Sequence, residues 1–364
     1  MSAAITTCQT SCPICGDRHA MVVAERDGKT GQALRTVQCC TCGTGRIDPL
    51  PTPAQLHAWY THHYRQDYKQ AVRPALRHVL RAGRNALDRW QWLQEATEKL
   101  GEPLPPAACT LDIGASSGEF VFLMRQRGFN ATGIEPHAGY AAHARESLGL
   151  SVENGSLHDR LPQAADGQFG LVTMFHVFEH LVDPLKTLQL IRRKVSHDGY
   201  LLIEVPNANR FCAPSYMFFR AHTLYFTAHS LRQALQTAGW KIVAQNPANS
   251  DNLLILAQPA PEATTAATWW NDGTLLAAQQ RRTWPAYLAD QVLNGRWWFK
   301  LARQQQERHT AARFSAPDAL LDALYAPGSA LAQPPHTEPH RYRLGLAGTG
   351  GLGAALGLYS AIDC

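Results

Sequence analysis

The chain has 364 residues, of which 45% are hydrophobic and 17% charged. These fractions are typical of a globular protein with a sizeable core, and the length allows two or more domains. The formal net charge is only +5 and no long run of one sign appears, so we expect no nucleic-acid partner. The N-terminus shows no basic region followed by an apolar one, so we expect a cytoplasmic protein. In a reducing compartment, metal binding by some of the nine cysteines explains their number better than disulfides do.

Residues 1–50 contain two C-x-x-C-G units and are expected to form a small zinc ribbon. Cys12 and Cys15 form the first unit, and Cys39 and Cys42 form the second, with β-like segments at 19–26 and 33–39. Two thiolates three residues apart can chelate one tetrahedral zinc, and four protein ligands close the site, which predicts a structural zinc. The alternatives are a loop of free thiols or a redox C-x-x-C, and the pairing of two units argues against redox chemistry.

The middle of the chain alternates strand-like and helix-like patterns. Residues 51–106 are expected to form a helical cap or linker that ends in a proline-rich stretch. Residues 107–260 follow, with strands expected at 108–114, 130–136, 151–154, 169–176, 199–206, 240–246 and 252–259. Helical segments between the first five strands require parallel pairing, while the short loop before the last strand permits an antiparallel hairpin. The pattern predicts an α/β fold whose sheet is mostly parallel, with one antiparallel strand near its end.

A glycine-rich turn follows the first of these strands. Asp112 ends the strand, Gly114 and Gly118 shape the turn, and Glu135 ends the next strand. Ligands of open α/β sheets bind at the carboxyl ends of the strands. NAD would require G-x-G-x-x-G spacing and a site that tolerates pyrophosphate, whereas this turn has G-x-x-x-G spacing beside a carboxylate. S-adenosylmethionine is a phosphate-free cation, so we expect Glu135 to bind its ribose hydroxyls and Asp112 its ammonium end. The alternative is a tight turn without a ligand.

Four segments carry a family resemblance: LDIGASSGEF, GIEP, FGLVTMFHVFEHLVDP and HTLYFTAHSLRQALQTAGW. Together they resemble the class I S-adenosylmethionine-dependent methyltransferases over about residues 107–258. The resemblance implies a Rossmann-like methyltransferase sheet. The chain departs from the family in two places. The family often has Gly in place of Ser116, and it often has an acid after the third strand, where this chain has the sequence GSL at 155–157. It also implies a set of cofactor-binding residues, namely Asp112, Gly114, Ser116, Gly118, Glu135, Ser156, Leu157 and Phe175.

Candidate catalytic side chains follow the fourth strand. His176, Glu179 and His180 would share one face if a helical turn begins at the first of them. His176 is then the best-placed general base for removing a proton from the methyl acceptor, and Glu179 would orient a histidine. The same three residues are also compatible with a divalent metal site or with a purely structural role. His222 is a further candidate, accompanied by Tyr225 and Thr227. The alternative role of these residues is a hydrogen-bond network in a lid.

The ribbon and the segment GRIDPLPTPAQLHAWYTHHY are similar to the N-terminal module of bacterial methyltransferases that include sugar-modifying C- and O-methyltransferases. This resemblance implies a sugar nucleotide, a glycan or a related small molecule as the acceptor. A ubiquinone-type O-methyltransferase is the rival hypothesis, and a cofactor-binding module whose ribbon docks a partner protein is a third. Nothing in the pattern indicates an oligomeric state.

The end of the chain divides into two further segments. Residues 261–340 are expected to be helical in pieces and then proline-rich. Residues 341–364 contain a G-x-G-x-x-G pattern at Gly348, Gly350 and Gly353, which resembles the opening of a second, truncated Rossmann-like unit. This last segment is uncharged over residues 344–362, but its many glycines make it a poor membrane helix, so we expect no stable membrane span.

Overall fold

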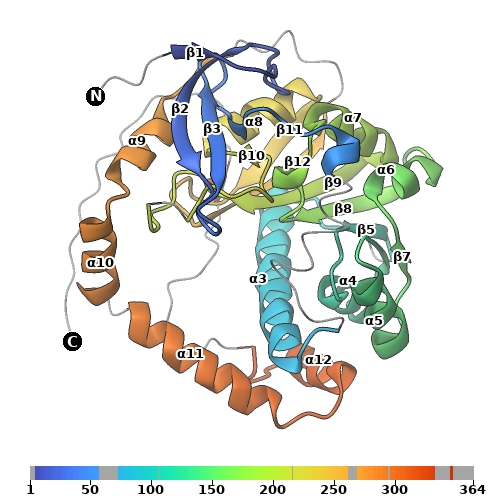
Figure 1. The fold of residues 1–364 in the computed structure, drawn as a ribbon. Coiled ribbons are helices and arrows are strands. Elements are labelled where there is room, and N and C mark those ends of the chain that lie inside the picture. Colours follow the sequence, from blue (N-terminus) through green and yellow to red (C-terminus); the bar gives the residue numbers. More distant parts are fainter. Residues whose placement is uncertain are drawn as a thin grey trace.

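The computed structural model describes residues 5–56, 73–105, 107–214, 216–260, 269–293, 296–332 and 345–346. Two sheets organise these residues, one of eight strands and one of five. Figure 1 shows the five-stranded sheet packed above the larger sheet, with the long helix α3 (Leu76–Leu100) beneath it.

The eight-stranded sheet confirms the predicted α/β class. Its parallel part contains five strands, β5 (Cys109–Ile113), β6 (Asn130–Glu135), β7 (Val152–Asn154), β8 (Phe169–Phe175) and β9 (Val195–Pro206). These pair in the spatial order β9-β8-β5-β6-β7. The chain order therefore reverses beside β5, so the ends of β5, β6 and β8 meet at one edge where α/β proteins bind ligands.

The predicted antiparallel strand is β12 (Asn252–Pro259), which is inserted between β9 and β11 (Trp240–Gln245). It runs antiparallel to both neighbours. The short strand β13 (Gly345–Leu346) adds to the outer edge of β11, also antiparallel. The hairpin from β11 to β12 agrees with the short polar loop that joins these strands in the sequence.

Helices cover both faces of the large sheet because alternate residues of each strand point to opposite sides. On one face, Leu171, Leu202 and Leu254 pack against α3, α4 (Glu119–Gln126), α5 (Ala138–Leu148) and α12 (Pro317–Tyr325). On the other face, Val172 and Ile203 pack against α6 (Leu157–Arg160), η1 (Leu161–Gln163), α7 (Pro184–Lys194) and α8 (Ala228–Thr237).

The five-stranded sheet is antiparallel and joins two distant parts of the sequence. Its first four strands belong to the N-terminal region: β1 (Ile5–Thr7), β2 (His19–Arg26), β3 (Ala33–Cys39) and β4 (Gly45–Ile47). The fifth, β10 (Leu224–Tyr225), comes from the segment after β9 and pairs with β4. The N-terminal sheet is thus continuous with the segment that contains His222.

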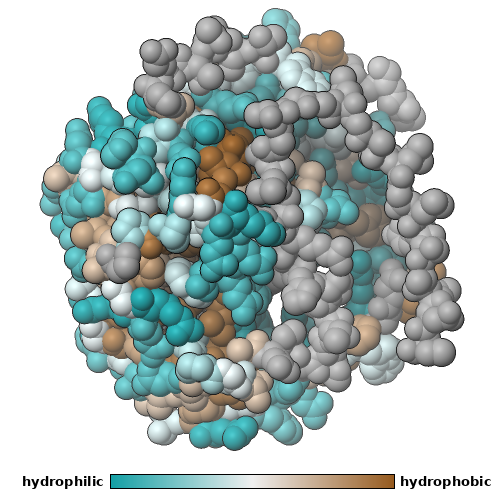
Figure 2. Space-filling model, turned by 180° about the vertical axis from the view of Figure 1, so that it is seen from behind, coloured by the Kyte–Doolittle hydropathy of each residue, from teal (hydrophilic) through white to brown (hydrophobic). Residues whose placement is uncertain are grey.

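The C-terminal helices lie along the outside of the molecule (Figure 1). They are α9 (Thr274–Arg281), α10 (Trp284–Leu293), α11 (Arg296–Ala311) and α12. Several large apolar side chains are exposed on α10 and α11, including Trp284, Leu293 and Trp298. On the face seen in Figure 2, the coloured surface is mainly hydrophilic, with separate hydrophobic areas.

Two sequence predictions fall largely outside the described residues. The helical cap is described only at 51–56 and 73–105, and the G-x-G-x-x-G pattern of residues 348–353 lies outside the described residues. Among the described residues, no helix combines the length and apolar character that crossing a bilayer requires.

Candidate active site and zinc site

The glycine-rich turn connects β5 to α4 at the edge where the parallel strands end. Gly114 and Gly118 have φ values of 76° and 92°, a region that favours glycine. A Cβ atom on Gly114 would lie 2.4 Å from Val177 Cγ2, and one on Gly118 would lie 2.7 Å from Leu150 Cδ1. Ser116 also has a left-handed φ, 51°, a region that glycine adopts at lower cost than a residue with a Cβ.

Glu135 holds this turn through both of its carboxylate oxygens. The backbone N–H of Ser116 donates to Oε2 at 2.9 Å, and the N–H of His137 donates to Oε1 at 2.8 Å. The carboxylate is 8% exposed and lies at the end of β6, next to the start of α4. Since each carboxylate oxygen can accept more than one hydrogen bond, both can still accept from a diol while they fix the turn.

Asp112 is buried at the end of β5, where its Oδ1 accepts a 2.6 Å hydrogen bond from Thr173 on β8. Burial raises the pKa of Asp112 to about 7, although the Thr173 hydroxyl and the positive charge of Arg89 oppose this shift. A carboxyl group whose charge is destabilised by burial gains most from a cation placed beside it. The donor set around the turn therefore fits a cationic cofactor with ribose hydroxyls.

The other predicted cofactor residues lie at the same edge of the sheet. Ser156 precedes α6 and caps it, accepting from the N–H of Asp159 at 3.3 Å while its hydroxyl donates to the Asp159 carboxylate at 2.7 Å. Leu157 is buried at the start of α6. Phe175 ends β8 and packs edge-on against Phe120 of α4. The structure thus brings the segments after β5, β6, β7 and β8 to one edge, as a ligand bridging them requires.

His176 lies directly after β8 between two buried carboxylates. Its Nδ1 is 3.4 Å from Glu179 Oε1, and its Nε2 is 3.4 Å from Glu204 Oε1 on β9. Burial disfavours the imidazolium, but the two carboxylates outweigh it and raise the pKa of His176 to about 9. The histidine also adopts a left-handed φ of 56°, a strained conformation for a residue with a Cβ. Its geometry favours a fixed positive charge at neutral pH.

Glu179 lies at the centre of three histidines. It belongs to a short 3₁₀ helix, η2 (Phe178–His180), so the helical turn predicted from His176 begins two residues later. Glu179 Oε1 is 3.9 Å from the Nε2 atoms of both His180 and His222. The Glu179 side chain is 2% exposed, and neither oxygen has a hydrogen-bond partner within bonding distance among the described residues.

His180 and His222 face each other, with ring centroids 4.9 Å apart. The Nδ1 of His180 is 2.6 Å from the Ala221 carbonyl, which can only accept, so this nitrogen carries a proton and Nε2 faces Glu179. Burial lowers the pKa of His222 well below its usual range, and the neighbouring His180 and His176 lower it further. His222 is therefore neutral at physiological pH.

The cluster also contains three side chains that are close enough to hold a metal ion. They are not the three that the sequence suggests, because His222 takes the place of His176. Glu179, His180 and His222 offer ligand atoms that lie within 4.8 Å of one another, whereas His176 is not part of this group. Tyr225 and Thr227 do not join it: the Tyr225 hydroxyl bonds the backbone of Phe219, and Thr227 caps α8.

Sequence reasoning missed the charged residues that surround these histidines. Lys29, in the turn between β2 and β3, places its Nζ 3.5 Å from the ring centroid of Phe219. That ring in turn lies 4.0 Å from the ring of His222. Glu204 was also missed, and the only sequence signal was an acid inside the apolar strand segment 199–206.

The four predicted zinc ligands come together as one cluster. The sulfur atoms of Cys12, Cys15, Cys39 and Cys42 all lie within 4.8 Å of one another. Two of the sulfur pairs, Cys12–Cys42 and Cys15–Cys39, are 3.6 and 3.4 Å apart. Zinc–sulfur bonds of about 2.3 Å in a tetrahedron imply sulfur separations of about 3.8 Å, so the cluster is compatible with a structural zinc.

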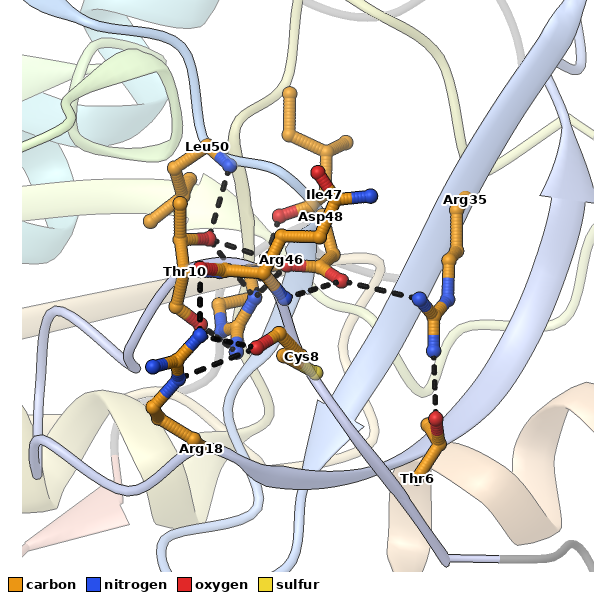
Figure 3. A network of polar contacts seen from close by, with 10 residues as sticks. Thr6, Cys8, Thr10, Arg18, Arg35, Arg46, Ile47, Asp48 and Leu50 are labelled. Carbon is orange, nitrogen blue, oxygen red and sulfur yellow. Dashed lines mark hydrogen bonds and ion pairs between the residues drawn. The ribbon is translucent and has the colours of Figure 1, made fainter.

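A buried ion pair supports this cluster from the side of β4 (Figure 3). Arg46 NH1 lies 3.2 Å from Asp48 Oδ1, and both side chains are fully buried. Arg46 also donates to the carbonyl of Thr10 at 2.7 Å, while Arg35 reaches Asp48 Oδ2 at 3.3 Å. The segment before Cys12 is therefore tied to β3 and β4 by charged hydrogen bonds, which limits the ways in which the knuckles can open.

The N-terminal sheet also contacts the His222 segment directly. The N–H of Gly28 donates to the carbonyl of Phe218 at 2.6 Å, and Asp27 accepts from the N–H of Arg220 at 2.8 Å. Beyond them, β10 pairs with β4 immediately after His222. The region that holds the zinc ligands thus supports one wall of the histidine cluster.

A family model described as a methyltransferase domain matches residues 83–245. A ubiquinone biosynthesis O-methyltransferase of Pseudomonas aeruginosa is 30% identical over 126 residues, which make up 33% of this chain and 51% of that protein. The enzyme of the same name from Pseudomonas entomophila is 29% identical over 126 residues, with the same coverage of both chains. The chain spans about half the length of the curated relatives it matches.

Solved structures with a similar course of the chain include a methyltransferase of Thermotoga maritima, described as a possible histamine N-methyltransferase. It is 19% identical, and the match covers 50% of this chain and 99% of that one, with a TM-score of 0.37. A methyltransferase of Listeria monocytogenes is 14% identical, with coverage of 49% and 99% and a TM-score of 0.40. The family match, together with the sheet order and the glycine turn, identifies an S-adenosylmethionine-dependent methyltransferase domain in this chain.

Proposed function

We propose that the protein methylates a carbon or oxygen atom of a sugar nucleotide, a glycan or a related small molecule, with His222 as the general base. S-adenosylmethionine would supply an electrophilic methyl group, and the residues of this chain would position the acceptor and remove its proton. The observation that carries this proposal is a largely buried histidine whose Nε2 lies 3.9 Å from the buried carboxylate of Glu179, and burial lowers the pKa of this histidine.

His222 suits proton abstraction better than the other histidines of the cluster. A base must have a free lone pair at working pH, and the low pKa of His222 leaves it unprotonated. When His222 takes a proton, Glu179 is 3.9 Å away and stabilises the new imidazolium. His176, which the sequence favours as the base, is already held between Glu179 and Glu204 as a cation.

Two cations beside His222 favour an acceptor that carries a negative charge. Lys29 and Arg210 both contribute to the low pKa of His222. Burial lowers the pKa of Lys29, the charge of Asp27 opposes this shift, and Arg210 adds a smaller lowering effect. Lys29 comes from the N-terminal sheet and Arg210 from the segment after β9, so their charges converge from two directions. Phosphate groups gain strongly from such paired cations, and this supports a sugar nucleotide over an uncharged phenol.

The ubiquinone-type O-methyltransferase remains the second candidate because the curated relatives bear that name and match 126 residues of this chain. A cofactor-binding module without catalysis is the third, and the fully formed cluster around Glu179 argues against it. The two enzymatic hypotheses differ in the acceptor, since a nucleotide sugar carries a diphosphate that Lys29 and Arg210 can bind.

The experiment that tests the proposal follows methyl transfer to a panel of nucleotide sugars, free glycans and phenols. With any acceptor found, the change His222→Gln should lower kcat by about 100-fold or more, since a general base contributes about 10²–10⁴-fold. The Kd for S-adenosylmethionine should stay within about two-fold, because His222 lies outside the glycine turn. The control is His197→Gln, a histidine 95% exposed at the start of β9, which should leave both quantities unchanged.

Full turnover by the His222→Gln protein would refute the assignment of the base. Turnover with phenols but not with nucleotide sugars would favour the ubiquinone-type reaction. If the protein binds S-adenosylmethionine but methylates none of the compounds in the panel, the non-catalytic module becomes the better hypothesis.

A further inference from the structure

The inner end of the histidine cluster is a row of alternating charges that reaches from α3 to η2. Arg89 of α3 donates from Nε to Glu204 Oε2 at 2.6 Å, and both side chains are largely buried. The other oxygen of Glu204 accepts from Asn252 Nδ2 at 2.8 Å and lies 3.4 Å from His176 Nε2. On its far side, His176 contacts Glu179, which faces His222.

We propose that Arg89 and Glu204 are positioning residues of the methyltransferase: Arg89 orients Glu204, Glu204 holds His176 as an imidazolium, and this cation orients Glu179 toward His222. The inference rests on the proposed role of His222 as the base. It adds Arg89 and Glu204 to the residues that support the base, and it gives His176 the role of orienting Glu179 in place of proton abstraction.

The backbone geometry supports this assignment independently of charge. The N–H of His176 donates to the carbonyl of Glu204 at 2.9 Å, so the two residues are fixed to each other by main chain as well as by side chain. His176 keeps its left-handed φ although it carries a Cβ, and such conformations persist only where surrounding contacts over-determine them. Arg89 contributes to these contacts, because its guanidinium lies 4.0 Å from the ring centroid of the adjacent Phe175.

The charged groups that the described residues place around His176 are consistent with a permanent imidazolium. Glu179 on η2 and Glu204 on β9 face its two ring nitrogens, and Arg89 on α3 lies behind Glu204. His180 and His222 lie across Glu179, and Asp112 on β5 interacts with Arg89 from the cofactor side. Both nearest groups are buried carboxylates, each 3.4 Å from a ring nitrogen of His176, so both nitrogens face groups that only accept hydrogen bonds. The His176 side chain itself is 39% exposed, and solvent therefore weakens this attraction without removing it.

The test is a pH titration of His176 by NMR, with histidine labelled in the ring and the resonance assigned by His176→Gln. In the wild-type protein His176 should titrate near pH 9, as its raised pKa requires. The isosteric change Glu204→Gln should lower that midpoint by about two units, because it removes one of two facing negative charges. At pH 8 it should also lower kcat by about ten-fold, with the cofactor Kd within about two-fold.

The kcat of the Glu204→Gln protein should recover toward pH 6, where its His176 is protonated again. His222 stays neutral there because its own pKa is far lower. This recovery distinguishes a lost charge from a damaged fold, since a damaged fold would lower kcat by a similar factor at every pH. The matched control is Glu307→Gln, which removes the buried carboxylate that pairs with Arg81 on the same helix α3, and it should leave the titration of His176 unchanged.

A second variant, Arg89→Met, reverses the sign of the expected shift. Removing the cation behind Glu204 increases the negative potential at His176, so its midpoint should stay at or above the wild-type value while kcat falls through the loss of orientation. A wild-type midpoint near the ordinary histidine value, or a fall of the midpoint in both variants, would overturn the proposal. Activity retained by His222→Gln with these titrations as expected would refute only the proposed base and leave the charge network intact.

Discussion

The proposed cofactor end of this site, around the glycine turn, and its proposed acceptor end, around His222, are built in different ways. At the cofactor end, Asp112, the glycine turn and Glu135 come from one strand–turn–helix–strand segment. Hydrogen bonds within that segment hold the turn and Glu135, and Thr173 of β8 holds Asp112. At the acceptor end, Lys29, Arg89, Glu204 and His222 come from four distant segments and meet only through tertiary contacts. The difference indicates that the two ends can be damaged separately, and the predictions below are designed to test this.

The largest expected effect is the removal of the four-cysteine cluster by Cys12→Ser combined with Cys39→Ser. Structural zinc sites contribute folding free energy directly, so these changes should release about one zinc per chain and loosen the N-terminal sheet. Since β4 pairs with β10 next to His222, turnover should fall by about 100-fold or more. The Kd for S-adenosylmethionine, measured by calorimetry, should change by less than about three-fold, because the glycine turn lies in the other sheet.

If the cysteine variant lost cofactor affinity by the same factor as turnover, the two ends would not be independent. Zinc retained after both substitutions would contradict the assignment of the four-cysteine cluster. The control is Cys40→Ser, which changes a neighbouring thiol outside the cluster and should leave metal content and turnover unchanged.

The converse prediction is Glu135→Ala at the cofactor end. It removes the acceptor for the Ser116 and His137 N–H groups as well as the expected ribose ligand. The Kd for S-adenosylmethionine should rise by about 100-fold, or ~2.7 kcal/mol, as expected for losing more than one hydrogen bond to a charged group. Zinc content should stay at that of the wild type, and the NMR midpoint of His176 should not move. An affinity unchanged by this variant would remove Glu135 from the cofactor site.

The smallest of these effects concerns the pH dependence of cofactor binding through Asp112. Burial raises its pKa to about 7, so in the free protein the group is protonated below that pH. As the pH falls, protonation of the buried Asp112 stabilises the fold. The cationic cofactor interacts favourably only with the ionised form of Asp112, so it is bound more weakly at lower pH. Between pH 7 and pH 6 the Kd should therefore rise by up to about ten-fold, the limit for one linked proton.

Asp112→Asn provides the matched variant for this measurement, because it keeps the shape of the side chain and cannot ionise. Its Kd should be higher at pH 7 and nearly independent of pH over the same range. If the wild-type protein shows the same flat profile, Asp112 does not interact with the cationic part of the cofactor.

The sequence contained enough information to predict the large sheet, the glycine turn and the cysteine cluster. Each of these depends on residues close together in the chain: strand and helix periods over 107–260, the turn at 114–118 and the paired C-x-x-C-G units. Parallel strands also bring their carboxyl ends to one edge, so residues such as Asp112 and Glu135 could be placed together without knowing the packing.

Only the tertiary structure distinguishes the two histidines, because burial lowers the pKa of His222 whereas two facing carboxylates raise that of His176. His176 and His222 both follow strands and cannot be distinguished by sequence, because their protonation depends on Glu204, Lys29 and other groups that are far away in the chain. The pairing of β10 with β4 likewise joins the cysteine-containing sheet to the His222 segment, and no local pattern predicts it. Local periodicity thus determined the sheet and the cofactor turn, whereas long-range burial and charge decided the chemistry of the acceptor end.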